Sequence, residues 1–227
     1  MSTNVHKFKN SSRLGSLAAI LAIGLLLAAS SAEAIVFDLT SDHCTGTCGT
    51  PPFGDVTLTQ NGTTVDVTVH LNSPNFFVKT GSADDMAFKF NATGVALTDI
   101  TVDQNAPKPL AAEFSAQPNG FNGDGTGQFE FGIDCPTCGG GASDQFNSDI
   151  IFHVAGATIA DLTVPNNLGN VFVADIISNS EFGGNGNTGP VDATTPRNVP
   201  DSGSTALLLG LGLFGLGFVR MPLRKKA

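Results

Sequence analysis

The chain has 227 residues, a formal net charge of −9 and neither tryptophan nor tyrosine. Residues 35–201 hold nineteen of the twenty acidic residues but only four of the eleven basic ones, so the formal charge of this central part is −15. Such a body repels nucleic-acid phosphates and anionic lipid headgroups, which argues against a nucleic-acid-binding or membrane-surface protein.

The first thirty-four residues have the pattern of a secretory signal peptide. A basic stretch precedes an apolar stretch at residues 14–29, and Ala32 and Ala34 form the small-x-small pattern that signal peptidase accepts. We therefore expect export through the general secretion machinery and a mature chain that begins at Ile35. The alternative is an uncleaved anchor, but this apolar stretch is short for a membrane span.

The central part, about 165 residues long, has the size of one domain and the periodicity of β-strands. Residues 63–71 alternate between apolar and polar side chains, with Val65, Val67 and Val69 on one face. The same alternation recurs at residues 86–90, 129–133, 150–154 and 171–173. Weaker strand candidates lie at residues 35–40, 56–60, 76–80, 97–102, 112–116 and 158–164.

Turn residues separate these candidate strands. Asn61 and Gly62 favour a type I′ turn, which predicts a β-hairpin over residues 56–71. A helical turn at residues 158–162 is an alternative to a strand there. Further turn clusters lie at residues 91–94, 118–127 and 183–189.

Nearly a dozen short strands without a sustained helical period predict an all-β fold, an antiparallel β-sandwich of jelly-roll-like or immunoglobulin-like type. We place this domain at residues 35–182. Residues 183–198 are rich in Gly, Asn, Thr and Pro, and we expect a flexible tether there with at most one short strand near Val191.

The four cysteines form two local pairs, Cys44 with Cys48 and Cys135 with Cys138. An exported chain with an even number of cysteines favours disulfides, and local pairing needs the least rearrangement. The alternatives are cross-linked loops, a four-thiolate zinc site, or a redox-active pair at Cys135 and Cys138, which lacks the expected βαβ context.

Catalytic motifs are absent from the sequence. The histidines of the central part are His43, His70 and His153, and the last two lie within strand patterns. No nucleophile elbow, zinc-binding helix or carboxylate pair accompanies them. We therefore expect a non-catalytic protein without a cofactor.

Residues 122–127 are the best candidate for calcium binding. Asn122, Asp124 and Thr126 alternate with glycines as in the start of an EF-hand loop, but Ile133 occupies the position of the bidentate glutamate. The EF-hand pattern therefore fails. A looser calcium site remains an alternative to ordinary turn residues.

The aromatic residues of the central part are all phenylalanines, and most fall at inward strand positions. Sugar-binding surfaces generally use Trp or Tyr, whereas Phe mostly fills cores. Phe53, Phe121, Phe146 and Phe182 lie in apparent loops and are the candidates for an exposed aromatic surface.

The last twenty-nine residues combine three parts in a fixed order. The short motif Val199, Pro200, Asp201, Ser202, Gly203 is followed by an apolar stretch and then by the basic residues Arg220, Arg224, Lys225 and Lys226. The apolar stretch at residues 206–219 spans about 21 Å as a helix, against about 30 Å of hydrocarbon. This tail therefore has the character of a transient membrane segment and sorting signal, with its basic end in the cytoplasm.

These residues resemble the VPDSG variant of the PEP-CTERM sorting domains. The resemblance implies a Gram-negative exported protein, recognised and processed near the motif by a membrane-embedded exosortase, in the setting of extracellular polysaccharide and biofilm matrix. Pro200, Asp201 and Ser202 replace the Pro-Glu-Pro core, which leaves the type of exosortase open. A weaker rival is the LPxTG signal of Gram-positive sortase substrates, with Val199 for Leu and Ser202 for Thr.

Parts of the central body, at residues 131–139, 172–177 and 187–189, resemble bodies of other PEP-CTERM proteins, which have no assigned activity. We therefore expect a structural or adhesive component of the cell surface or matrix. The alternatives are a polysaccharide- or calcium-binding module and a sortase-anchored wall protein.

Overall fold

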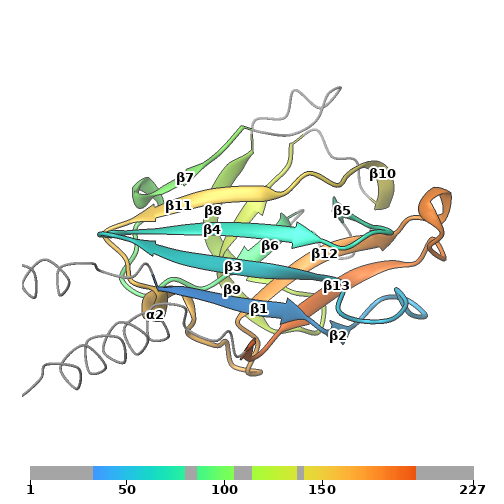
Figure 1. The fold of residues 1–227 in the computed structure, drawn as a ribbon, viewed down its shortest axis with the longest axis horizontal. Coiled ribbons are helices and arrows are strands. Elements are labelled where there is room, and N and C mark those ends of the chain that lie inside the picture. The colour runs from blue at the N-terminus through green and yellow to red at the C-terminus, as the bar shows by residue number, and fades with distance from the viewer. Residues whose placement is uncertain (1–32, 80–85, 105–113, 137–140, 198–227) are drawn as a thin grey trace, which may run out of the picture. The chain divides into compact units, whose positions relative to one another are not determined.

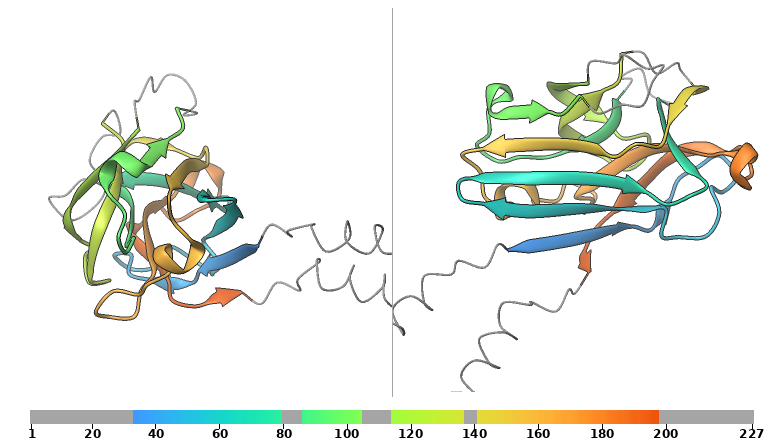
Figure 2. Two further views of the ribbon diagram at one scale, coloured as in Figure 1. Left: turned by 90° about the vertical axis from the view of Figure 1, so that its left-hand side faces the viewer. Right: turned by 45° about the horizontal axis from the view of Figure 1, so that its top comes forward.

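The computed structural model describes residues 33–79, 86–104, 114–136 and 141–197 (Figure 1). In these residues the backbone forms two antiparallel sheets that pack face to face (Figure 2). The chain is a β-sandwich, as its alternating sequence pattern predicts.

The first sheet is centred on the hairpin predicted at residues 56–71. Its two strands pair from Gly54 opposite Leu71 to Asn61 opposite Thr64. Their apolar side chains are buried and alternate with more exposed polar ones. In spatial order the sheet contains β14 (Pro196–Arg197), β1 (Ala34–Leu39), β3 (Gly54–Asn61), β4 (Thr64–Leu71), β11 (Ile150–Ala155) and β7 (Ile100–Val102).

The turn of this hairpin differs from the predicted one. Asn61 pairs with Thr64, so Gly62 and Thr63 are the central turn residues. Gly62 has a φ of 62°, and neither Asn61 nor Thr63 has a positive φ. A positive φ at the first central residue alone is the pattern of a type II′ turn, which accepts glycine there and leaves Asn61 within the strand.

The second sheet is built around β12 (Phe172–Ser178), which pairs with three strands. One edge of β12 pairs with β13. The other edge is shared, because β6 pairs with its first residues and β5 with its last ones, so the sheet forks at Asp175. Besides β12, the sheet contains β5 (Asn75–Lys79), β6 (Met86–Phe90), β9 (Gln128–Asp134), β8 (Ser115–Asn122), β10 (Gly141–Phe146), β13 (Thr188–Ala193) and β2 (Ser41–Asp42).

Two segments differ from the sequence-based expectation, and at residues 158–164 the predicted alternative of a helical turn is confirmed over the strand. The cluster at residues 118–127 is only partly a turn, since Pro118 lies in β8 opposite Phe131. Proline is tolerated there because β8 is at the edge of its sheet, and an irregularity follows before Phe121. Residues 158–164 contain the helical turn α2 (Ile159–Leu162), and residues 97–102 begin with a 3-10 turn, η1 (Leu97–Asp99).

The expected tether at residues 183–198 also contains more structure than one flexible linker. Its middle forms β13, whose residues from Gly189 to Ala193 are buried, and its end forms the exposed pair β14. The apolar Val191 and Ala193 pack into the core, which explains why this glycine-rich segment is held in the sandwich.

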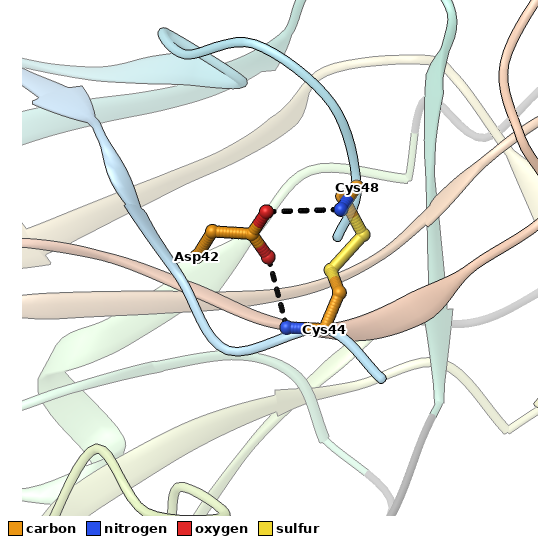
Figure 3. A group of neighbouring side chains, drawn as sticks. All are labelled: Asp42, Cys44 and Cys48. Atoms are coloured by element: carbon orange, nitrogen blue, oxygen red, sulfur yellow. Dashed lines mark hydrogen bonds between the residues drawn. A yellow bond between two sulfur atoms is a disulfide. The ribbon is translucent and has the colours of Figure 1, made fainter. Parts of the chain in front are cut away.

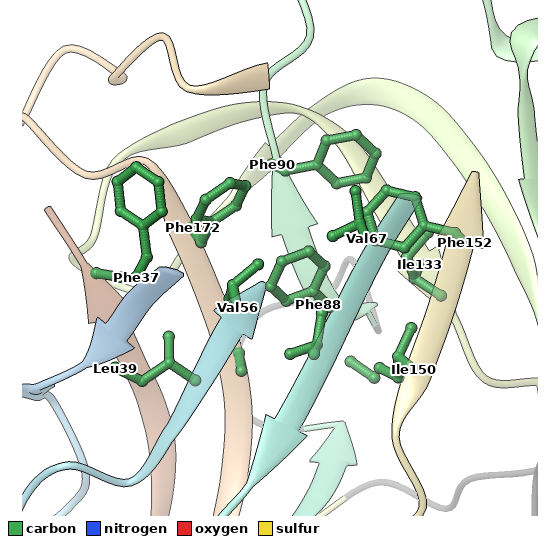
Figure 4. Packing of buried hydrophobic residues seen from close by; sticks show 14 of the residues in the cluster. Phe37, Leu39, Val56, Val67, Phe88, Phe90, Ile133, Ile150, Phe152 and Phe172 are labelled. Atoms are coloured by element: carbon green, nitrogen blue, oxygen red, sulfur yellow. The ribbon is translucent and has the colours of Figure 1, made fainter. Parts of the chain in front are cut away.

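Phenylalanine rings join the two sheets in the core (Figure 4). Phe88 of the second sheet has ring neighbours at 6.1 Å in Phe152 of the first sheet and at 5.9 Å in Phe172. Phe37 meets Phe172 edge-to-face at 5.1 Å. Such ring pairs add about 0.5–1.5 kcal/mol each beyond the area they bury. These four phenylalanines are core residues, as expected for most of the phenylalanines.

The described chain begins and ends at neighbouring positions on the first sheet. The strand β14 lies beside β1 (Figure 2). Val36 of β1 pairs with Arg197 of β14, and the Asp38 carboxylate lies 3.3 Å from the Arg197 guanidinium. The first and last strands of the sandwich are therefore neighbours, with β14 at the edge of the sheet and β1 next to it.

Candidate functional site

The first cysteine loop is a closed and hydrogen-bonded structure (Figure 3). Cys44 and Cys48 form a disulfide, so the predicted local pairing is confirmed for this pair. The Asp42 carboxylate accepts hydrogen bonds of 2.9 Å from the backbone N–H groups of both cysteines and of 2.7 Å from Thr47 Oγ1. Burial opposes ionisation of Asp42, but these hydrogen bonds together lower its pKa below the usual value.

This loop is also the only place among the described residues where three potential metal-binding side chains converge. The ligand atoms of Asp42, Cys44 and Cys48 lie within 4.8 Å of one another. Both sulfurs are engaged in the disulfide, and the two cysteines are at most 9% exposed. This buried disulfide, with a carboxylate that binds backbone N–H groups, has a structural role. A zinc site needs free thiolates, so these two cysteines cannot form one while they are disulfide-bonded.

The disulfide loop also binds the neighbouring loop at one end of the sandwich. Asn185 Nδ2 and Asn187 Nδ2 both donate to the Thr47 carbonyl, at 2.6 and 2.8 Å. The loop between β12 and β13 is thereby bound to the disulfide loop. Cys135, in the second predicted pair, is also disulfide-bonded, and Cys138 lies outside the described residues.

His43 belongs to a Ser-His-Asp cluster that sequence spacing did not reveal. Its Nε2 lies 2.8 Å from Asp192 Oδ2 and 3.3 Å from Ser41 Oγ. Serine and aspartate thus share one ring nitrogen, whereas a catalytic triad needs them on opposite nitrogens. Burial raises the pKa of Asp192, and the contacts with His43 and Ser41 partly offset this effect. The cluster connects β2 to β13 and has no triad geometry.

His153 and His70 lie on the outer face of the first sheet, each beside a carboxylate. His153 Nδ1 is 2.7 Å from Asp66 Oδ1, and its Nε2 is 3.4 Å from Asp103 Oδ1. The hydrogen bond with Asp66 raises the pKa of His153, burial lowers it, and Asp103 raises it further, with a net rise. His70 Nδ1 lies 2.7 Å from Asp149 Oδ1. Both nitrogens of His153 are occupied, so it bridges strands and offers no free base.

A buried ion pair lies at the fork of the second sheet and was also not predicted. Lys89 Nζ is 3.2 Å from Asp175 Oδ2, and both residues are 1% exposed. A buried charge requires a partner of opposite sign, so each residue makes the other tolerable in the sheet. Lys89 of β6 lies opposite Val173 of β12, and Asp175 is two residues after Val173. Lys89 and Asp175 are therefore diagonal neighbours on the same face of the sheet.

The candidate calcium loop is closed by hydrogen bonds within the protein. Thr126 Oγ1 donates to the Gly123 carbonyl, and the side chains of Asn166 and Asn170 both donate to the Thr126 carbonyl, at 2.7 and 2.8 Å. These bonds fix the β8–β9 turn against the loop after α2. Among the described residues, Asp124 belongs to no group of three or more His, Cys, Asp or Glu side chains that could hold a metal ion.

The prediction that four phenylalanines lie in loops is wrong for Phe121 and Phe146, which belong to β8 and β10, and only one of the four is on the surface. Phe53, Phe121 and Phe146 are buried, whereas Phe182 is 58% exposed. Phe182 closes the short turn η2 (Ser180–Phe182), and its ring centroid is 5.1 Å from that of Phe76. Gly183 follows in a left-handed conformation, and Asn179 caps the turn through the Glu181 N–H. The exposed ring is therefore held by a well-bonded loop.

A groove of about 670 Å³ lies where β1 begins, beside the β3–β4 turn and α2. Gln60 organises it: Nε2 donates to the Ala157 carbonyl at 3.1 Å, and Oε1 accepts from the Ile159 N–H at 3.0 Å. Glu33 is the only ionisable residue in its described lining. The groove thus lacks the convergent titratable groups of a general acid–base site.

The predicted processing residues lie mostly outside the described ranges. Ala32, the motif from Val199 to Gly203, the apolar stretch at residues 206–219 and the basic end are all beyond them, whereas Ala34 is the first residue of β1. Among the described residues, no helix is long and apolar enough to cross a membrane.

Comparison with protein families identifies residues 198–220 as a VPDSG-CTERM motif. This match confirms the exosortase-type sorting signal and favours it over the LPxTG alternative. Comparison with curated proteins and with solved structures found no match. The chain thus carries, directly after β14, the signal of an exosortase-processed exported protein of the cell surface.

Proposed function

We propose that this exosortase-processed protein is a structural or adhesive component of the exopolysaccharide or biofilm matrix and has no catalytic activity. The observation that carries the proposal is the VPDSG-CTERM match, which begins at residue 198, directly after the last strand of the sandwich. The strongly acidic body supports it, because such a surface keeps an exported protein soluble at high local concentration.

The histidine geometry also supports a non-catalytic role. His43 offers Ser41 and Asp192 the same nitrogen, and both nitrogens of His153 face carboxylates. These arrangements bridge strands and stabilise the sandwich. Because these histidine side chains make contacts within the sandwich, the proposed role does not require them as reactive groups. It depends on the surface of the sandwich as a whole.

The proposal is tested by comparing a deletion strain with strains that express the wild type or Pro200→Ala/Gly203→Ala. The wild type should yield a body without its basic C-terminus that cofractionates with the extracellular polysaccharide. The double variant should remain in the membrane as precursor, and its strain should share the matrix defect of the deletion. A normal matrix in the deletion strain, or intact residues 223–227 on the surface protein, would contradict the proposal.

Phe182 favours polysaccharide binding as a second candidate function. Its exposed ring lies on a bonded turn, and an aromatic face can pack against the apolar face of a sugar ring. Leu168 is equally exposed, at 58%, in a different loop, and so offers a matched control. If this surface binds polysaccharide, Phe182→Ala should weaken cosedimentation of the protein with the extracted polymer at least fivefold, while Leu168→Ala should not. Equal binding by the two variants would remove this candidate.

A further inference from the structure

The buried ion pair at the fork of the second sheet places an amine against a carboxyl group. Lys89 Nζ donates a hydrogen bond of 3.2 Å to Asp175 Oδ2, an atom bonded to the carboxyl carbon. Groups held about 3–3.5 Å apart react as if one of them were present at an effective concentration of about 10⁵ M or more. The strands β6 and β12 supply this positioning, because Lys89 lies opposite Val173, two residues before Asp175.

The surroundings of the pair exclude water. Lys89 and Asp175 are each 1% exposed. Asp175 lies between Val173 and Ile177 on one face of β12, and these apolar neighbours are 0% and 5% exposed. A covalent bond formed in such a place is protected from hydrolysis.

The start of β6 and a glycine of β9 hold the lysine in place. Lys89 Nζ also donates to the Met86 carbonyl at 3.4 Å. The Met86 side chain lies over Gly132, the residue of β9 opposite Lys89, and a Cβ at Gly132 would be 2.5 Å from Met86 Cγ. The glycine therefore lets Met86, which is 7% exposed, pack against the sheet next to the lysine.

Forming an amide between the two groups removes both of their charges. Taking two ions out of water costs free energy, which their mutual attraction offsets only when the geometry is good. Transfer of one proton from the ammonium to the carboxylate gives a neutral amine and a neutral carboxylic acid. These are the forms that react to give an amide, and a site without water favours neutral groups.

We propose that Lys89 and Asp175 form an isopeptide bond within the folded protein. A proton first moves from the Lys89 ammonium to Asp175 Oδ2, and the neutral nitrogen then attacks the Asp175 carboxyl carbon. The bond between this carbon and its hydroxyl oxygen breaks, and a second proton from the nitrogen goes to the departing hydroxyl. One water molecule leaves, and nothing is oxidised or reduced. The bond joins β6 to β12 covalently, and it is independent of the proposed matrix role.

The test is mass spectrometry of the exported protein recovered from the producing cells, after reduction of its disulfides. The wild type should be lighter by one water molecule than the sequence between its observed ends. After proteolysis, the peptides that contain Lys89 and Asp175 should be joined through these two residues. Recovery of Lys89 and Asp175 in separate peptides, each of unmodified mass, would overturn the proposal.

A second ion pair in the same sheet provides the matched control. Lys79 Nζ of β5 is 3.8 Å from Asp134 Oδ1, and this pair is more exposed, at 11% and 22%. Lys79→Met should keep the joined peptide and the loss of water, whereas Lys89→Met should abolish both. A joined peptide that is lost in Lys79→Met, or a loss of water that persists in Lys89→Met, would contradict the assigned bond.

The Lys89→Met variant leaves a buried carboxylate without its lysine, which can prevent folding. The double variant Lys89→Met/Asp175→Leu removes both charged groups and serves as the second test. It should be exported with the full mass of its sequence. The joined peptide of the wild type is measured without any variant, so its presence or absence tests the proposal even where a variant fails to fold.

Discussion

The Asp42 carboxylate holds the disulfide loop by accepting hydrogen bonds from Cys44, Cys48 and Thr47. Asp42→Ala should lower the free energy of unfolding by about 1–2 kcal/mol, since two backbone N–H groups lose their acceptor. Chemical denaturation at pH 7 measures this change. Asp55→Ala is the control, because the Asp55 carboxylate contacts the Thr57 hydroxyl at 3.3 Å and no loop N–H.

The same carboxylate gives the protein an acid-sensitive contribution to stability. The pKa of Asp42 is lowered by folding, so its contribution is present above the unfolded value of about 3.8 and is lost as the pH falls through the folded pKa. The difference in unfolding free energy between wild type and Asp42→Ala should therefore shrink below pH 4. A difference that stays constant from pH 7 to pH 2.5 would contradict this linkage.

His153 should show the opposite pH dependence. Its pKa is raised, mainly by the hydrogen bond with Asp66, so its contribution is present below the ordinary value of 6.5 and is lost as the pH rises through the folded pKa. The substitution His153→Gln should lower the free energy of unfolding at pH 5 and lower it less at pH 8.5. The loss at pH 5 should not exceed about 1 kcal/mol, because the ion pair is partly exposed. An NMR titration should place the pKa of His153 lower in Asp66→Asn and unchanged in Asp149→Asn.

Sequence reasoning located the histidines of this surface but not their partners. The alternation in β4 places Asp66 and His70 on the polar face, and that much follows from a period of two. The pairing of Asp66 with His153 depends on the register between β4 and β11, which are far apart in the chain. A strand pattern carries no information about register with a distant partner, so this contact could not be predicted.

At the scale of elements, the β3–β4 turn tests the difference between the two turn types. Gly62→Ala should destabilise the protein by about 1–2 kcal/mol, because only Gly62 requires a left-handed conformation. Asn61→Ala should have a smaller effect, since Asn61 stays in the strand and its side chain makes one exposed hydrogen bond of 3.3 Å to Asp66. Thermal unfolding of both variants decides the matter, and a larger loss for Asn61→Ala would favour the type I′ turn.

The elements that the sequence predicted best are those whose apolar residues alternate without interruption, such as β4 and β11. β8 was missed in part because Pro118 and Gly120 are typical turn residues, and only its edge position in the sheet permits them. β13 was underestimated because its glycine-rich surroundings hide the buried Val191 and Ala193. The fork of β12 at Asp175 could not be predicted, since local patterns do not specify which strands share an edge.

At the scale of the whole sandwich, the β12–β13 loop and the β3–β4 turn lie at opposite ends (Figure 1). The turn is at the end where β1 begins, close to where β14 leads into the sorting motif. The loop with Phe182 should therefore point away from the membrane while the precursor is held by its C-terminal segment.

This orientation is measured with single added cysteines in the membrane-retained Pro200→Ala/Gly203→Ala precursor. Glu181→Cys, in the distant loop, should react faster than Thr63→Cys with a bulky maleimide on spheroplasts, and both should react alike after detergent solubilisation. Thr63 and Glu181 are both exposed, so they form a matched pair. Equal rates on spheroplasts would show that the sandwich is not held in this orientation.

The short strand β14 also determines how much unpaired chain lies between the sandwich and the sorting motif. Only residue 198 separates Arg197 from the sorting motif, so a folded body leaves almost no free chain. If β14 detaches from β1, residues 194–198 provide roughly 17 Å of extended chain before the buried end of β13 must unfold. Because β14 is two residues long and exposed, this release breaks few contacts, and it would let an enzyme within the membrane reach the motif while the sandwich stays intact.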